Sequence, residues 1–184
     1  MSPAATTLLA GQLDRSRLGQ QAASMTDITF PTLHEATVLP EWIDYNGHMN
    51  LAYYVVVFDQ ATDALYDRLG IWLPYRQASG NSCFTVETHT IYEQEVKLGD
   101  RVLVRTRLLG ADAKRLHYFH EMFHQREGYR AAVQEVMALH VDLAVRRTAP
   151  FPPDRHAVIQ AALASCASLP APKEAGRRIA MPAG

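Results

Sequence analysis

The chain has little cysteine, no excess of either charge and no long apolar segment. Its two cysteines, Cys83 and Cys166, lie in unrelated surroundings, so no disulfide framework is expected. The 18 basic and 19 acidic residues give a net charge of −1, so no basic excess indicates nucleic-acid binding. No apolar run approaches the ~20 residues that span a membrane. We therefore expect a cytoplasmic protein that binds neither nucleic acid nor membrane.

The length and composition favour one globular domain. The chain has 184 residues, of which 48% are hydrophobic, and this is enough for a single core. Residues 1–24 lack periodicity and the pattern of a signal peptide, so we predict a disordered extension or an upstream start-site choice. We place the domain at residues 25–153. Residues 154–184 are expected to form a C-terminal helix, up to about residue 168, and a flexible tail.

Residues 51–69 carry the most regular pattern in the chain. Asn50 is a suitable N-cap, because its side-chain oxygen can accept a hydrogen bond from a free amide of the first turn. Gly70 suits the left-handed conformation of a C-terminal cap. The spacing predicts a long, buried central helix whose inward stripe consists of Leu51, Val55, Phe58, Ala61, Leu65 and Leu69.

A period of two after residue 83 indicates strands. We expect a short strand at residues 33–39, a loop at 71–83, and strands at 84–92, 101–109, 114–125 and 129–145. In the strand at 84–92, one face is predicted to carry Phe84, Val86, Thr88, Thr90 and Tyr92, and the other Glu87, His89 and Ile91. One long helix among successive antiparallel strands indicates an α+β fold.

The stretch before the central helix is dense in functional groups. Asp44, Asn46, His48 and Asn50 alternate there with Tyr45, Gly47 and Met49. A helix N-terminus presents free N–H groups and a partial positive charge, which can polarise a carbonyl group beside a carboxylate base or nucleophile. An ordinary Asn/Gly turn that caps a helix is the alternative explanation of the same residues.

These residues also carry a family resemblance. The run D-Y-N-G-H-M-N-L-A-Y-Y resembles the signature of hotdog-fold acyl-CoA thioesterases of the 4-hydroxybenzoyl-CoA thioesterase type. The blocks F-T-V-E-T-H-T-I-Y-E-Q-E-V, L-G-D-R-V and D-A-K-R-L-H-Y-F-H-E-M extend the similarity over about residues 35–153. Together they look most like the branch that hydrolyses betainyl-CoA in carnitine breakdown.

The resemblance implies a fold, a reaction and an assembly. The fold would be an antiparallel sheet wrapped around one long helix, and the reaction would be hydrolysis of a small acyl-CoA thioester without a cofactor. Asp44 would act as nucleophile or general base, while amides near residues 48–50 hold the oxyanion. Glu87 and His89 would complete the catalytic pocket. Family members pair their sheets edge to edge, so we expect a homodimer or a dimer of dimers with the pocket between subunits.

Two further groups of residues are candidates for substrate binding. Aromatic faces near a carboxylate suit a quaternary ammonium group, although any single aromatic residue is more often core filler. Lys114 and Arg115 follow a turn and are predicted to bind CoA phosphates, although most such pairs are merely solvated. The predicted acyl-binding residues are Asn46, Gly47, His48, Met49, Asn50, Tyr45, Tyr53, Tyr54 and Trp42.

One motif points to a different chemistry. Residues 120–124, with His120, Glu121 and His124, have the HExxH form of zinc proteases, which requires a helix. Flanking turn signals favour a strand, in which the two histidines lie ~13 Å apart at ~3.3 Å per residue. Zinc requires ~2.0–2.1 Å to each nitrogen. We therefore predict no metal site. A zinc enzyme and a non-hydrolytic acyl-CoA-binding module stay as alternatives.

Overall fold

The computed structural model describes residues 31–181, so the expectation for residues 1–24 lies outside the described part of the chain. The fold is α+β. None of the described helices is long and apolar enough to cross a membrane. The elements are β1 (Thr32–Thr37), a 3-10 turn η1 (Pro40–Trp42), α1 (Leu51–Arg68), α2 (Leu73–Ser79), β2 (Asn81–Tyr92), β3 (Arg101–Ala111), β4 (Arg115–His124), β5 (Arg130–Asp142), β6 (Arg147–Thr148) and α3 (Pro153–Cys166).

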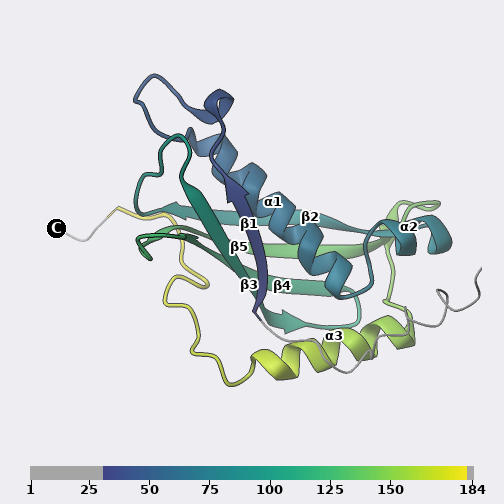
Figure 1. The fold of residues 1–184 in the computed structure, drawn as a ribbon. Coiled ribbons are helices and arrows are strands. Elements are labelled where there is room, and N and C mark those ends of the chain that lie inside the picture. Colours follow the sequence, from purple (N-terminus) through teal and green to yellow (C-terminus); the bar gives the residue numbers. More distant parts are fainter. Residues whose placement is uncertain (1–30, 182–184) are drawn as a thin grey trace, which may run out of the picture.

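One antiparallel sheet organises the domain. Its strand order is β1-β3-β4-β5-β2, and the short β6 pairs with β5. The sheet curls around α1, and β1 crosses over the helix (Figure 1). This is the hotdog architecture that the family resemblance implies. β2 is a long edge strand, and among the described strands only β5 pairs with it.

The central helix begins and ends where its capping residues predict. The Asn50 side chain accepts a hydrogen bond from the Ala52 amide at 3.0 Å, which satisfies one donor of the first turn. Gly70 follows the helix with a φ of 68°, in the left-handed region that favours glycine. These two signals are local, so the sequence predicts them correctly.

The predicted inward stripe of α1 is only partly correct. Phe58, Ala61 and Leu65 are buried, but Leu51 is 62% exposed and Val55 is 40% exposed. The helix packs on β1 and β3 within the curl of the sheet, and the flank with Leu51 and Val55 is left open. Helical spacing shows that a stripe is apolar but does not show what covers it.

The predicted loop at residues 71–83 is wrong. It contains the short helix α2 and the start of β2. Proline is tolerated in the first turn of a helix, where its missing N–H would have no partner, so Pro74 does not prevent α2. Gly80 then ends α2 with a φ of 68°.

A β-bulge breaks the predicted alternation of β2 near its start, whereas the alternation from Glu87 onward is as predicted. Its pairing register with β5 shifts between Thr85 and Glu87, so Val86 is an extra residue. Thr85 and Thr88 both pair with residues buried beneath α1, whereas Phe84 pairs with Leu139 on the other face. A strict period of two cannot continue through an inserted residue.

The C-terminal segment is part of the domain. Ile159 and Ala162 of α3 are fully buried in the same apolar cluster as Leu65 and Leu69 of α1. The sequence predicts a flexible tail after Pro170, but the structure holds this segment against the sheet. There, Arg107 donates a hydrogen bond to the carbonyl of Pro170 at 2.6 Å.

Candidate active site around Asp44

A cavity of about 410 Å³ opens at the N-terminal end of α1. Residues of the preceding loop form one wall, and the segment that follows β2 forms the opposite wall. The cavity is lined by Asp44, Tyr45, Asn46, His48, Met49, Asn50, Leu51, Tyr54, Tyr92, Glu93, Gln94 and Glu95. Its lining therefore includes most of the predicted acyl-binding residues and the predicted catalytic aspartate.

Asp44 is held by a tight turn of its own loop. Its Oδ1 atom accepts a hydrogen bond from the Asn46 amide at 2.8 Å, and its carbonyl accepts one from the Gly47 amide at 3.0 Å. Gly47 has a φ of 81°, which most side chains disfavour. Oδ2 has no hydrogen-bond partner among residues 31–181. The carboxylate is thus oriented through one oxygen, and the other oxygen is not engaged by the described residues.

Only some of the amides predicted to hold an oxyanion at the helix start are available. The Met49 amide donates to the Val96 carbonyl at 2.8 Å, and the Asn50 amide donates to the Trp42 carbonyl at 2.9 Å. Both donors are therefore engaged and cannot serve an oxyanion. Within the described part of the chain, the amides of His48 and Leu51 have no acceptor. These two residues line the cavity and lie at the positive end of the helix dipole.

His48 does not orient Asp44 through its side chain. Its Nε2 atom lies 3.9 Å from the Glu95 carboxylate, and Nδ1 lies 3.4 Å from the Met49 carbonyl. The backbone carbonyl of His48 does accept a hydrogen bond from the Asp44 amide at 3.1 Å, which closes the loop. His48 therefore supports the loop and contributes polarity to the cavity wall.

Two tyrosines form the floor of the cavity. Tyr54 is buried, and its hydroxyl accepts a hydrogen bond from the Val96 amide at 3.2 Å. Burial raises the pKa of Tyr54 above its usual value, so the phenol is neutral near pH 7. Tyr92 packs edge-on against Tyr54 with ring centroids 5.3 Å apart. The sequence analysis missed Tyr92 as a site residue, because only the fold brings the end of β2 to the helix start.

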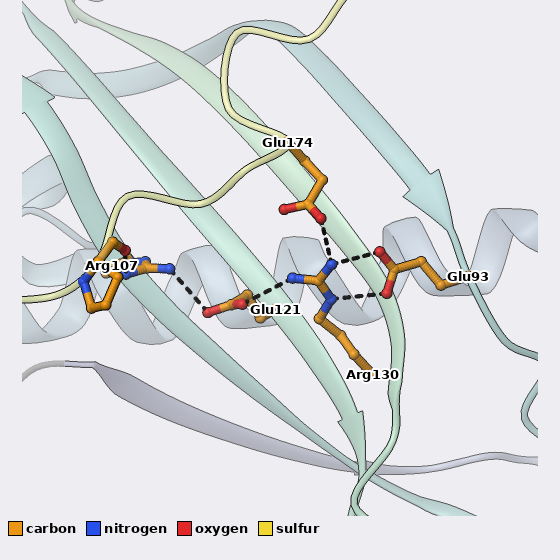
Figure 2. A network of polar contacts seen from close by, with 6 residues as sticks. Glu93, Arg107, Glu121, Arg130 and Glu174 are labelled. Atoms are coloured by element: carbon orange, nitrogen blue, oxygen red, sulfur yellow. Dashed lines mark hydrogen bonds and ion pairs between the residues drawn. The ribbon is translucent and has the colours of Figure 1, made fainter.

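The charged side chains that line the cavity are acidic, and two of them are paired with cations outside it. It contains the carboxylates of Asp44, Glu93 and Glu95, and neither lysine nor arginine. Glu95 is paired with Lys97 at 3.3 Å on the exposed surface. Glu93 is held by both Nε and Nη2 of Arg130, at 2.8 and 2.6 Å (Figure 2). The sequence analysis did not identify Glu93 as a site residue, because the side chain that holds it, Arg130, is 37 residues away in the sequence.

The predicted aromatic cluster is divided between the cavity and the core. Trp42 and Tyr53 stack with ring centroids 5.4 Å apart and pack with the apolar cluster rather than lining the cavity. Tyr54 lines the cavity as predicted, and Tyr45 lies at its mouth with 97% of its surface exposed. The core-filler explanation therefore applies to Trp42 and Tyr53.

Glu87 and His89 do not meet Asp44 within one chain. They lie on the face of the sheet opposite α1, in a separate cavity of about 340 Å³ beneath the C-terminal tail. His89 pairs across the strands with Glu135, whose carboxylate also contacts His117 Nε2 at 2.7 Å. The prediction that both residues complete the pocket of Asp44 is not supported by this geometry. They share a strand face as expected, but it is the wrong face.

Lys114 and Arg115 lie at the opposite end of the sheet from Asp44. Arg115 pairs with Leu139 near the end of β5, whereas the segment beside the Asp44 cavity hydrogen-bonds to Ala131 near its start. Arg115 Nε donates to Asp112 at 2.6 Å. Its charge is thus used locally, while Lys114 is exposed to solvent.

The HExxH residues form part of β4, as the flanking turns predict. His120 is fully buried; its two nitrogens lie 3.1 Å from the Thr62 hydroxyl and 2.7 Å from the Thr106 hydroxyl. His124 instead contacts Asp100 at 3.3 Å. Two imidazoles with separate partners on one strand do not have the helical arrangement of a zinc protease.

A second cavity, of about 460 Å³, lies at the other end of the open flank of α1. Its walls come from α1, α2 and the start of β2. They carry two carboxylates and one guanidinium group beside aromatic rings, from Asp59, Asp63, Arg76, Tyr66, Trp72 and Phe84. Burial, followed by the nearby Asp59 carboxylate, raises the pKa of Asp63. No ion pair involves Asp59 or Asp63 within residues 31–181. The sequence analysis did not identify this acidic, aromatic cavity.

Comparisons with known proteins agree with this architecture. The family model of the thioesterase-like superfamily matches residues 38–163, so the chain belongs to that superfamily. It is a thioester hydrolase with a hotdog fold. The region matched begins just before the Asp44 loop and ends within α3.

Individual relatives make the similarity more specific. The chain is 46% identical to a betainyl-CoA thioesterase from Pseudomonas aeruginosa, over 82% of this chain and 95% of the relative. It is 48% identical to part of an L-carnitine dehydrogenase/betainyl-CoA thioesterase from Agrobacterium fabrum, over 66% of this chain and 25% of that protein. A Staphylococcus aureus protein solved in complex with CoA superimposes with a TM-score of 0.78 at 30% identity, over 84% of this chain and 98% of that one.

Proposed function

We propose that this protein hydrolyses betainyl-CoA, a small cationic acyl-CoA thioester of carnitine breakdown, to the free acid and CoA. The observation that carries this proposal is Asp44, whose free carboxylate oxygen lies in a cavity at the start of α1, next to unpaired amides. The acidic, tyrosine-rich lining supports a quaternary ammonium acyl group, because carboxylates and aromatic faces both attract such a cation. The relatives named for betainyl-CoA support the same substrate.

The reaction can proceed by attack of Asp44 or of a water that it activates. In the first case Oδ2 forms a bond to the thioester carbon, the CoA thiolate leaves and takes up a proton, and water then hydrolyses the mixed anhydride. In the second case Asp44 accepts a proton from the attacking water, and the tetrahedral intermediate expels the thiolate. In both, the amides of His48 and Leu51 donate to the developing oxyanion. No metal takes part in this scheme.

A homodimer formed along β2 is the assembly that we propose. β2 offers a free edge twelve residues long. Large apolar side chains are exposed on this strand and on the adjacent flank of the helix, which is unusual for a surface that stays in water. They are Phe84, Val86 and Tyr92 on β2, and Leu51 and Val55 on α1.

Such a dimer would join the two cavities along α1. When two copies of β2 pair antiparallel, the start of one strand lies beside the end of the other. The cavity with Asp59 and Asp63 borders the start of β2, and the cavity with Asp44 borders its end. We infer that each active site combines Asp44 of one subunit with the acidic, aromatic cavity of its partner.

The predicted CoA-binding residues and two of the predicted catalytic residues are not part of this reaction scheme. Lys114 is retained as a predicted contact of the CoA phosphates, because it is exposed and has no carboxylate partner among the described residues. Arg115 is less suited to that role, since Asp112 already engages it. Glu87 and His89 have no step in the reaction.

Release of CoA from a matched pair of thioesters tests the proposal. Betainyl-CoA and 3,3-dimethylbutyryl-CoA have the same shape, but only the first carries a positive charge. We expect efficient turnover of the cationic thioester, and a loss of about 10²–10⁴-fold in kcat for Asp44→Asn. Turnover of neutral thioesters alone would refute the cationic substrate. Binding of CoA without any hydrolysis would refute the reaction, and loss of activity to a chelator would favour the zinc alternative.

A further inference from the structure

The tail that follows α3 crosses the face of the sheet opposite α1 (Figure 2). Three hydrogen bonds anchor it there. Arg107 donates to the Pro170 carbonyl at 2.6 Å, Arg130 to Glu174 at 2.6 Å, and the Gly176 amide to Glu135 at 2.8 Å. We call residues 170–176 the C-terminal strap. It lies beyond the residues that match the superfamily.

Arg130 connects this strap to the wall of the active-site cavity. Its guanidinium group holds Glu93 with two hydrogen bonds, at 2.8 and 2.6 Å. The same Nη2 atom donates to Glu174 at 2.6 Å, and Nη1 donates to Glu121 at 3.2 Å. Since Glu93 lines the cavity of Asp44, one residue joins the strap to the site.

The charges in this network do not cancel. It contains the carboxylates of Glu93, Glu121 and Glu174 and the guanidinium groups of Arg107 and Arg130, which leaves one negative charge. All five side chains are at least partly buried, so solvent screens them less than surface ions. Partial burial opposes ionisation of Glu174, but Arg130 outweighs it and lowers the pKa of that carboxyl. The strap therefore supplies a carboxylate that is ionised near pH 7.

We propose that the C-terminal strap is a specificity element of the active site, in which Glu174 and Arg130 position Glu93 and maintain a negative cavity wall that selects a cationic acyl group. This inference rests on the proposed function for its substrate. Glu174 and Arg130 are positioning residues, because they act through Glu93. Without Glu174, the remaining two carboxylates and two guanidinium groups are neutral overall, and the wall attracts a cation less.

Glu174→Gln tests the proposal, with Glu174→Asp as the variant that keeps the charge. The Glu127→Gln control removes an exposed carboxylate whose ion-pair partner among residues 31–181 is Arg126. We expect Glu174→Gln to raise KM for betainyl-CoA about two- to threefold, a small effect because Glu174 acts on the bound cation only through Arg130 and Glu93. In Glu174→Gln, KM for 3,3-dimethylbutyryl-CoA and kcat for both thioesters should be unchanged. Glu174→Asp should restore the parent ratio of the two KM values.

Hydrogen exchange supplies a readout that does not depend on turnover. The amides of Glu93 and Gln94 both donate to the Ala131 carbonyl, next to Arg130. We expect faster exchange in the peptide that covers residues 92–96 in Glu174→Gln than in Glu127→Gln. Equal effects on both thioesters, or unchanged exchange, would overturn the role of the strap. If the parent protein hydrolyses neither thioester, the proposed function fails. The exchange measurement still tests the strap in that case: faster exchange at residues 92–96 in Glu174→Gln supports the positioning of Glu93, and unchanged exchange refutes it.

Discussion

Acid should destabilise this protein through one buried histidine. His120 is enclosed between Thr62, Thr106 and the ring of Phe58, whose centroid lies 5.5 Å from the imidazole. Burial is the main cause that lowers the pKa of His120 from 6.5 to about 3. The folded protein therefore keeps this side chain neutral at pH values where the unfolded chain would protonate it.

The sign and size of the effect follow from proton linkage. The folded pKa lies below the unfolded one, so the stabilisation is present in full above about pH 6.5 and is lost as the pH falls towards 3. Each pH unit within this window corresponds to about 1.4 kcal/mol. Between about pH 7 and pH 5, His120 alone should lower the free energy of unfolding by about 2 kcal/mol.

Urea unfolding followed by circular dichroism measures this slope. We would compare the parent with His120→Gln at one protein concentration, because the stability of a dimer depends on concentration. The variant can be less stable than the parent at every pH. Between about pH 7 and pH 5, however, its free energy of unfolding should fall by about 2 kcal/mol less than that of the parent. His156→Gln, the same substitution on α3 where the histidine contacts Gln160, is the matched control. Parallel slopes for the parent and His120→Gln would refute the reasoning.

Three further predictions concern the fold and the assembly. Gly70→Ala should lower the free energy of unfolding by about 1–2 kcal/mol, because Gly70 has a left-handed φ that alanine disfavours. Gly110→Ala is the control, since Gly110 does not have a positive φ. Equal melting temperatures of the two variants would contradict the prediction. Val86→Lys, on the free edge of β2, should convert a dimer to a monomer in light scattering, whereas Leu33→Lys, exposed on β1 at the other edge of the sheet, should not. Ile159→Ala should cost about 2–4 kcal/mol in chemical denaturation, and an unchanged midpoint would show that α3 is not part of the core.

Much of the fold follows from short-range patterns in the sequence. The cap residues Asn50 and Gly70 lie where the helix begins and ends, because capping involves groups only a few positions apart. The strand around His120 is also predicted correctly, since turn signals on both sides limit its length. The loop with Asp44 was identified from its own residues and from their resemblance to a family.

The errors fall where distant segments meet. An inserted residue, Val86, reverses the alternation of β2, and the pairing with β5 makes this visible. Glu87 and His89 lie beneath the tail instead of beside Asp44, because the packing of α1 on the sheet decides which face of β2 is turned away from the helix. Two of the donors expected at the helix start, the amides of Met49 and Asn50, are taken by the carbonyls of Val96 and Trp42. The amide of His48 has no acceptor among the described residues, and neither has the amide of Leu51.

The sequence by itself thus determined the class of fold, the central helix and the loop with the reactive carboxylate. These depend on periodicity and on hydrogen bonds between near neighbours, which are written in consecutive residues. Only the tertiary structure decided which carboxylates share the cavity, which amides stay free and where the tail lies. Arg130 holds Glu93 and Glu174 from positions 37 and 44 residues away, and no local pattern encodes such a contact.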